Sequence, residues 1–180
     1  KTRMMVQIAM LTAVAEVLML FDFPLPFAPS FYKIDLSEVP ILIGCFAMGP
    51  AAGIIIEAMK ILLNFIISGT VTAGVGELAN FAIGCSMVLP AGLIYRYHKT
   101  RKNAVLGMAA GTLVMAAIGG LLNAFVLLPA YAALFGGMDA IIGMGTAVNK
   151  NITSVQSFVL LSVVPFNLVK GVIVSLVTFL

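Results

Sequence analysis

Residues 4–21 read MMVQIAMLTAVAEVLMLF, an apolar run interrupted only by Gln7, Thr12 and Glu16. A helix of about 20 predominantly apolar residues is long enough to cross a bilayer, so this run predicts a membrane-spanning helix. The rest of the chain has the same character: 62% of its 180 residues are apolar, 9% are charged, and the mean hydropathy is +1.15. Soluble domains carry about 25% charged residues. The composition therefore predicts an integral membrane protein.

Five further segments are apolar enough to form helices, and residues typical of turns separate them. Ser37 can cap a short second helix. The loop over 22–36 is unusually aromatic, so we expect it to pack back on the helices rather than extend into solvent. We expect the segment 129–164 to be a loop with one or two short interfacial helices. The sequence thus predicts a single-domain (1–180), all-α membrane protein with six transmembrane helices, at 4–21, 37–47, 50–67, 77–95, 105–128 and 165–180.

Six of the ten basic residues form two clusters that flank apolar runs. Short basic loops beside membrane spans mark the cytoplasmic side. With six spans, both clusters fall on one side, so the sequence predicts cytoplasmic N- and C-termini and external loops. Aromatic side chains do not alternate with these charges as they do at base-stacking surfaces, so we expect no nucleic-acid partner. The clusters are Lys1 and Arg3, and Arg96, Lys99, Arg101 and Lys102.

Sequence motifs of catalysis and metal binding are absent. The chain has no GxxxxGK[ST] motif for nucleotide hydrolysis, no HExxH and no GxSxG. Cys45 and Cys85 lie 40 residues apart inside apolar segments, and His98 is the single histidine. These spacings predict neither a disulfide nor a metal site, and nothing in the sequence favours an enzyme.

Ionisable residues inside a membrane span are costly and often functional. Glu57 and Lys60 are three residues apart, so they can pair on one face of the third predicted helix. Asn64 lies one turn further along that face, where it extends a polar cavity wall. A self-neutralised structural pair explains Glu57 and Lys60 equally well. The sequence gives no position for Glu16 relative to these residues.

The last predicted helix carries a second polar face. Asn167 and Lys170 are three residues apart in its first turns, close to the predicted external surface, and their amide and ammonium groups offer several hydrogen-bond donors. Asn123 lies at a similar depth near the end of the fifth predicted helix. Together they predict a ligand pocket that opens to the outside. The alternative is that Lys170 only extends its ammonium group to the membrane interface.

Several of these motifs resemble the riboflavin-binding S component of energy-coupling factor (ECF) vitamin transporters. The resemblance covers nearly the whole chain, and its most specific segments are YKIDLSEVP (32–40) and PFNLVKG (165–171). Supporting segments are the Gly49-Pro50 break, GVGELANF (74–81) and LLPAY (127–131).

The resemblance implies a multi-pass protein of the bacterial cell membrane that captures riboflavin on the external side. It implies a transmembrane T subunit and two cytoplasmic ATPase subunits as partners, with riboflavin as the transported ligand and no separate cofactor. It assigns Asn167, Lys170 and Asn123 to the ligand. It also assigns Ala9 and Ala13, a small-residue pair that lets another helix approach closely, to contact with the T subunit.

The residues are compatible with such a ligand, because a flat ring system suits an aromatic pocket with a few polar anchors. We expect Phe27, Phe31 and Tyr32 to cap the pocket. Asp35, Glu77 and Asn80 can line its rim, although solvation or helix capping explains them nearly as well. Two alternatives remain at this point: an S component for another vitamin, and a small intramembrane enzyme that uses Glu57 and Lys60.

Overall fold

The computed structural model describes residues 2–29, 31–70 and 72–180, so the predicted role of Lys1 lies outside the described residues. Helices dominate these residues, as the apolar runs predicted. A two-residue antiparallel ladder, β1 (Phe23–Pro24) with β2 (Lys33–Ile34), is the strand structure among them. The helices are α1 (Thr2–Leu20), α2 (Glu38–Met48), α3 (Pro50–Ser68), α4 (Val75–Tyr97), α5 (Arg101–Leu122), η1 (Asn123–Leu127), α6 (Leu128–Phe135), α7 (Met138–Val148), α8 (Val155–Phe158), η2 (Val159–Val163) and α9 (Val164–Phe179).

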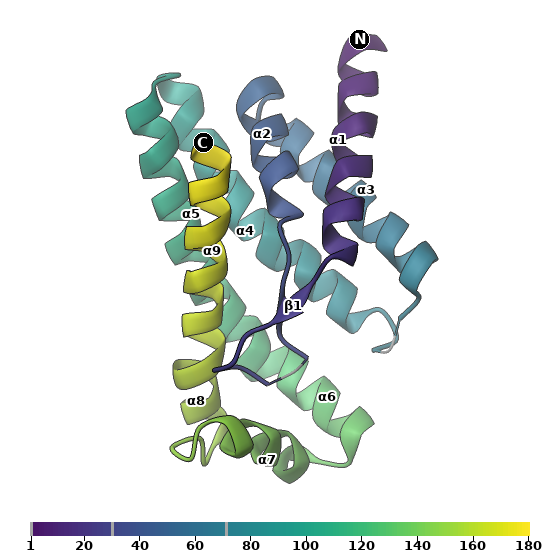
Figure 1. Cartoon of the computed structure of the whole chain (residues 1–180), viewed down its shortest axis with the longest axis vertical. Coiled ribbons are helices and arrows are strands. Elements are labelled where there is room, and N and C mark those ends of the chain that lie inside the picture. The colour runs from purple at the N-terminus through teal and green to yellow at the C-terminus, as the bar shows by residue number, and fades with distance from the viewer. Residues whose placement is uncertain (1, 30, 71) are drawn as a thin grey trace.

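Five continuous helical segments are long and apolar enough to cross a membrane. They are 2–20, 50–68, 75–97, 101–135 and 155–179. At 11 residues, α2 is too short to do so alone, as predicted. Figure 1 shows α2 in the half of the molecule that contains both chain ends, and the loop that contains β1 lies below it.

Two of the long segments extend further than the sequence predicted. We expected helices to end at Leu128 and to begin at Pro165, because proline lacks the N–H that a helix needs and clashes with the preceding turn. Instead, five-residue π-helical segments precede both prolines, η1 before Pro129 and η2 before Pro165. The wider turn relieves the clash, so each helix continues through its proline. The predicted loop 129–164 is therefore mostly helical, with α7 as the separate short helix.

Glycines bring α4 and α5 into close contact. A Cβ atom on Gly107 would lie 2.7 Å from the carbonyl oxygen of Ala91 in α4, so only glycine permits this approach. Gly171 of α9 similarly faces the side chain of Thr112 in α5. Without a hydrophobic driving force between helices in lipid, such close backbone packing provides much of the association energy. The helices α4, α5 and α9 therefore form a tightly packed part of the bundle.

The loop between α1 and α2 packs against the helices, as its aromatic content predicted. Ile34 is fully buried beside Phe166 of α9, and Lys33 pairs with Asp22 at 3.1 Å. The prediction that Ser37 caps α2 is wrong, because its own backbone is helical and its side chain makes no capping hydrogen bond. Its backbone N–H donates to Asp35 instead, at 2.8 Å. The loop is thus held at both ends.

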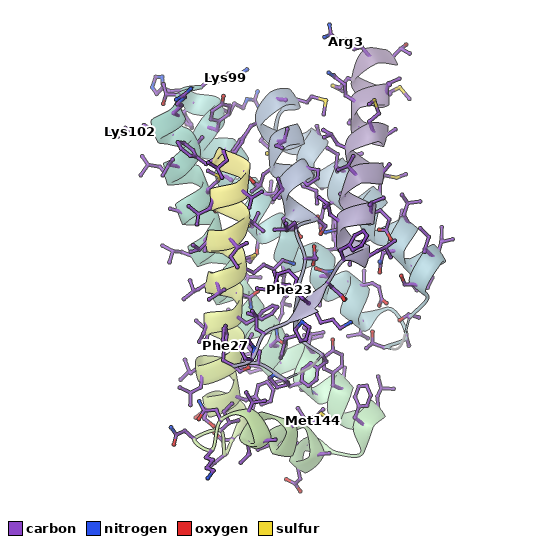
Figure 2. The ribbon with its side chains drawn as sticks, in the orientation of Figure 1. Arg3, Phe23, Phe27, Lys99, Lys102 and Met144 are labelled. Atoms are coloured by element: carbon purple, nitrogen blue, oxygen red, sulfur yellow. The ribbon has the colours of Figure 1, made fainter. Side chains whose placement is uncertain are left out.

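The two chain ends lie at the same end of the bundle (Figure 1). Arg3, Lys99 and Lys102 also lie at that end, and Met144 of α7 lies at the opposite end (Figure 2). The two basic clusters therefore share one side of the molecule, as the predicted alternation of spans requires.

Candidate functional site

A cavity of about 180 Å³, here called the central cavity, lies between the α1–α2 loop and the helices α4, η1, α6 and α9. It is on the α7 side of α2, away from the chain ends. Six of the nine predicted ligand-binding residues line it: Phe31, Tyr32, Asn80, Asn123, Asn167 and Lys170. The structure therefore gathers residues from both ends of the chain in one cavity.

Lys170 pairs across the fold with Asp35, at 3.2 Å between Nζ and Oδ2. Burial alone would raise the pKa of the Asp35 carboxyl, but Lys170 and then Lys60 outweigh it and lower that pKa to about 2. Lys170 is 8% exposed, so its ammonium group points inward and not to the membrane interface. Sequence reasoning left Asp35 at the rim. Lys170 has no acidic residue in its own helix, and this was the signal in the sequence that could have pointed to a carboxylate elsewhere as its partner.

The two asparagines are held in the same way at the two π-helical segments. Asn123 donates from Nδ2 to the carbonyl oxygen of Gly119, four residues earlier, at 2.8 Å. Asn167 donates to the carbonyl oxygen of Val163, also four residues earlier, at 2.9 Å. Tyr32 donates from its hydroxyl to Oδ1 of Asn123 and so ties the loop to η1. Because π-helical turns frequently occur at functional sites, their coincidence with both amides favours a binding role.

Aromatic rings form one wall of the central cavity. Phe31 contacts Tyr32 with ring centroids 4.7 Å apart and Tyr131 edge-on at 5.7 Å, and Tyr32 contacts Phe166 at 5.3 Å. Burial raises the pKa of the Tyr32 hydroxyl, so it stays protonated and remains a donor. Sequence reasoning missed Tyr131 and Phe166 as wall residues because they lie far from the loop in the chain. Phe27 packs on the apolar cluster beneath the loop instead of lining the cavity.

Lys60 does not line the central cavity, and its prediction as a ligand-binding residue is not supported by its position. It is fully buried and pairs with Glu57 at 2.9 Å, as the spacing predicted. A second carboxylate, Glu38 of α2, lies 3.1 Å from Nζ, and Ser37 accepts a hydrogen bond at 3.3 Å. Glu38 was expected only in a first helical turn. Through these contacts Lys60 links α2 to α3. Its ammonium group has Glu57, Glu38 and Ser37 as its three partners, so no N–H group remains to bind a solute.

Asn64 and Glu77 also lie outside the central cavity. Asn64 donates a hydrogen bond to Glu16 of α1 at 3.2 Å. Glu16, whose position the sequence did not indicate, therefore lies beside the polar face of α3. Asn64 lines a neighbouring cavity of about 360 Å³ that shares four residues with the central one. Glu77 accepts a hydrogen bond from Thr72 at 3.3 Å in the turn before α4. Its prediction as a ligand-binding residue stays a prediction.

Ala9 and Ala13 are both exposed on the outer face of α1, whose membrane-spanning stretch is only 17% buried within the chain. A helix with so little intramolecular packing has most of its surface available to lipid or to another protein. Among the described residues, no group of three His, Cys, Asp or Glu side chains is placed to hold a metal ion.

Comparison with known proteins identifies the family of the chain. The family model for the ECF transporter substrate-specific component matches residues 3–180. The riboflavin transporter RibU of Staphylococcus aureus (strain TCH60) is 35% identical over the whole chain and 88% of its own length. The riboflavin transporter FmnP of Bacillus subtilis (strain 168) is 33% identical over 98% of the chain and 88% of its own length.

A solved structure of the S component of a bacterial ECF transporter is also similar. It has a TM-score of 0.78 and 36% identity, over 98% of this chain and 91% of that one. The relatives are named as transporters and not as enzymes, so the intramembrane-enzyme alternative has no support. With the family model matching all but the first two residues, this multi-pass membrane protein belongs to the substrate-specific components of the ECF transporters.

Proposed function

We propose that this chain captures riboflavin at the external face of a bacterial membrane and presents it to an ATP-driven ECF module. The observation that carries the proposal is the pairing of an aromatic wall with the inward-facing polar groups of Asn123, Asn167 and Lys170 in one cavity. Two relatives that are 33–35% identical over nearly the whole chain are named riboflavin transporters. That agreement favours riboflavin over another vitamin.

The chemistry of the cavity suits this ligand. Riboflavin has a flat ring system with one hydrogen-bonding edge and a polyhydroxyl tail. Aromatic side chains contact a flat ring face without requiring directional bonds, and the amide and ammonium groups can bond the polar edge. In this proposal Asn167 and Lys170 hold the edge of the ring, while Phe31 and Tyr32 cover its face. Asn80 lines the cavity from α4, and in this proposal it contacts the tail.

The cavity must widen before it holds a ligand of this size. Its volume of about 180 Å³ is below the range of about 300–1,000 Å³ in which drug-sized ligands bind. The α1–α2 loop closes it through Tyr32 and Asp35. Riboflavin would displace Asp35 from Lys170 or share that ammonium group with it. We therefore expect ligand entry to move the loop and not the packed helices α4, α5 and α9.

Several observations support the orientation and the count of six crossings. The basic end of the bundle is the cytoplasmic end under the positive-inside rule, which places the central cavity in the external half. Helices α1 and α3 run in the same direction (Figure 1), so the chain must return across the membrane between them. The α1–α2 loop and α2 make that return, which gives six crossings with both chain ends in the cytoplasm.

The proposed partners are a transmembrane T subunit and two cytoplasmic ATPase subunits. The sequence has no GxxxxGK[ST] motif, and in this proposal the ATPase subunits supply the energy for transport. Ala9 and Ala13 offer the close-packing face for the T subunit because both are exposed on α1.

The direct test is to purify the protein in detergent, denature it and measure flavin fluorescence in the supernatant. We expect released flavin in roughly equal amount to protein, and submicromolar rebinding to the flavin-free protein. Parallel titrations with thiamine, biotin and pantothenate test the alternative of another vitamin. Absence of flavin together with saturable binding of one of those vitamins would transfer the proposal to that ligand.

A further inference from the structure

A second pair of cavities lies at the basic end of the bundle, away from the central cavity. One, of about 390 Å³, lies between the α2–α3 junction and the end of α4. The other, of about 410 Å³, lies between α4, α5 and the end of α9. Phe46, Tyr95 and Lys99 line both, and the two rings contact each other with centroids 4.8 Å apart. This aromatic pair gives the two cavities a shared, rigid wall.

The charge of these cavities is uncompensated. Arg96 and Lys99 line the first, and Lys99 and Arg101 line the second. Elsewhere in the described residues, Lys33, Lys60 and Lys170 pair with carboxylates, whereas the exposed Arg3, Lys102 and Lys150 line neither cavity and make no ion pair. Over the same residues, 2–29, 31–70 and 72–180, Arg96, Lys99 and Arg101 make no ion pair. None of the described acidic residues lines either cavity. An anion is therefore the chemically matched occupant.

An apolar groove continues from the second cavity along the outside of the bundle. It has a volume of about 450 Å³, lies between α5 and α9, and shares Met108 and Phe179 with the basic cavity. Its walls are apolar side chains such as Val105, Leu113 and Val172, which are 47%, 65% and 52% exposed. From Val105 to Leu113 the groove follows α5 for about 12 Å at 1.5 Å per residue. An occupant that matches both parts has an anionic head and a hydrocarbon tail.

We propose that this surface binds one anionic phospholipid, with its phosphate on Lys99 and Arg101 and one acyl chain in the groove between α5 and α9. Basic pockets between transmembrane helices on the cytoplasmic side suit anionic headgroups. A zwitterionic lipid carries a positive group that these unpaired side chains repel. The site does not depend on which vitamin fills the central cavity, because the two cavities share no lining residue.

The test is native mass spectrometry of the full chain after extraction from mixed phosphatidylglycerol and phosphatidylcholine bilayers. We expect one phosphatidylglycerol to remain on the wild-type protein. The double variant K99Q/R101Q should retain it about 30-fold less, equivalent to about 2 kcal/mol for two basic groups near a membrane surface. Lys150→Gln controls for the loss of an exposed positive charge at the other end of the bundle, after α7, and should leave retention unchanged.

A second pair of variants tests the groove without changing charge. Ala109→Leu fills the groove that Ala109 lines and should also reduce retention, whereas Ala117→Leu, at an exposed position of α5 outside the groove, should not. Unfolding temperatures in lipid-free detergent establish that each variant is folded. Equal retention of both lipids, or unchanged retention in K99Q/R101Q, overturns the proposal. Binding of soluble glycerophosphoglycerol as tight as that of the lipid would also overturn it, because the acyl chain would then contribute nothing.

Discussion

The pair of Asp35 and Lys170 allows folding and binding to be separated by a double-mutant cycle. Lys170→Met keeps most of the length of the side chain but removes Nζ, which lies 3.2 Å from Oδ2 of Asp35 in the wild type. The buried carboxylate is then left without its nearest cation. Breaking a buried pair in this way costs about 3–5 kcal/mol of the free energy of unfolding. Adding Asp35→Asn removes the unpaired negative charge, and the side-chain oxygen of the asparagine can still accept a hydrogen bond from the N–H of Ser37. We therefore expect the double variant to recover to within about 1 kcal/mol of the wild type.

Flavin affinity should follow a different pattern. Both variants lose the ammonium donor, and a hydrogen bond to a charged group is worth about 1.5–3 kcal/mol, which corresponds to about a 10- to 150-fold rise in Kd. The assays are denaturant titration in mixed micelles and flavin fluorescence quenching on the same preparations. A double variant that is as unstable as Lys170→Met would refute the ion pair. A double variant that binds flavin like the wild type would refute the role of Lys170 in binding.

Three further outcomes follow from buried contacts. Gly84→Ala places a Cβ atom 2.7 Å from the Glu57 carboxyl carbon and should lower the free energy of unfolding by about 1–3 kcal/mol, whereas Gly143→Ala meets no atom within 4 Å and should not lower it. Lys60→Met strands two buried carboxylates and should cost about 3–5 kcal/mol, but Glu57→Gln leaves the lysine its other carboxylate and should cost about 1 kcal/mol or less. The Asp35 carboxylate, with its pKa lowered to about 2 from 3.8, stabilises the fold fully above its ordinary pKa, and this contribution is lost as the pH falls toward 2. The stability difference between wild type and Asp35→Asn should then shrink by about 2 kcal/mol between pH 5 and pH 2.

Denaturant titrations measure the free energy of unfolding in all three predictions, and for each a different result would contradict the reasoning. Equal destabilisation by the two glycine substitutions would mean that Gly84 does not face the carboxylate. Glu57→Gln as damaging as Lys60→Met would mean that the lysine depends on Glu57 alone. A stability difference that stays constant with pH would mean that Asp35 is not held in its ionised form by Lys170.

The sequence predicted the parts of the fold that depend on local composition. Long apolar runs located the spans of α1, α3 and α4 to within a few residues, and the Glu57–Lys60 pair followed from helical spacing alone. It failed at Pro129 and Pro165, where a π-helical turn precedes the proline and the helix continues. No local pattern distinguishes such a turn from a break.

The candidate site was predictable where its residues share a helix face and not where the fold brings distant segments together. Asn167 and Lys170 were found by spacing. The partners Asp35 and Glu38 were not, because a charge pair across 135 residues depends on tertiary structure. Lys60 is a different case: an intramembrane charge indicates function by default, but a structural pair explained it equally well, and it lies between two buried carboxylates.

The two π-helical segments have a further consequence for how this bundle can change over evolutionary time. Each inserts about one residue beyond the α-helical repeat, which offsets the faces on its two sides by about 100°. In the helix that contains η1, Gly107 lies before the π-helical segment, and its close contact with α4 fixes which face of the helix is turned toward α4. Asn123 lies in the π-helical segment, where the rotation of the helix faces changes. The orientations of the helix faces before and after this segment are therefore set separately. Under the proposed function, substitutions around Asn123 would change which solute the cavity accepts without rotating the glycine face of the same helix.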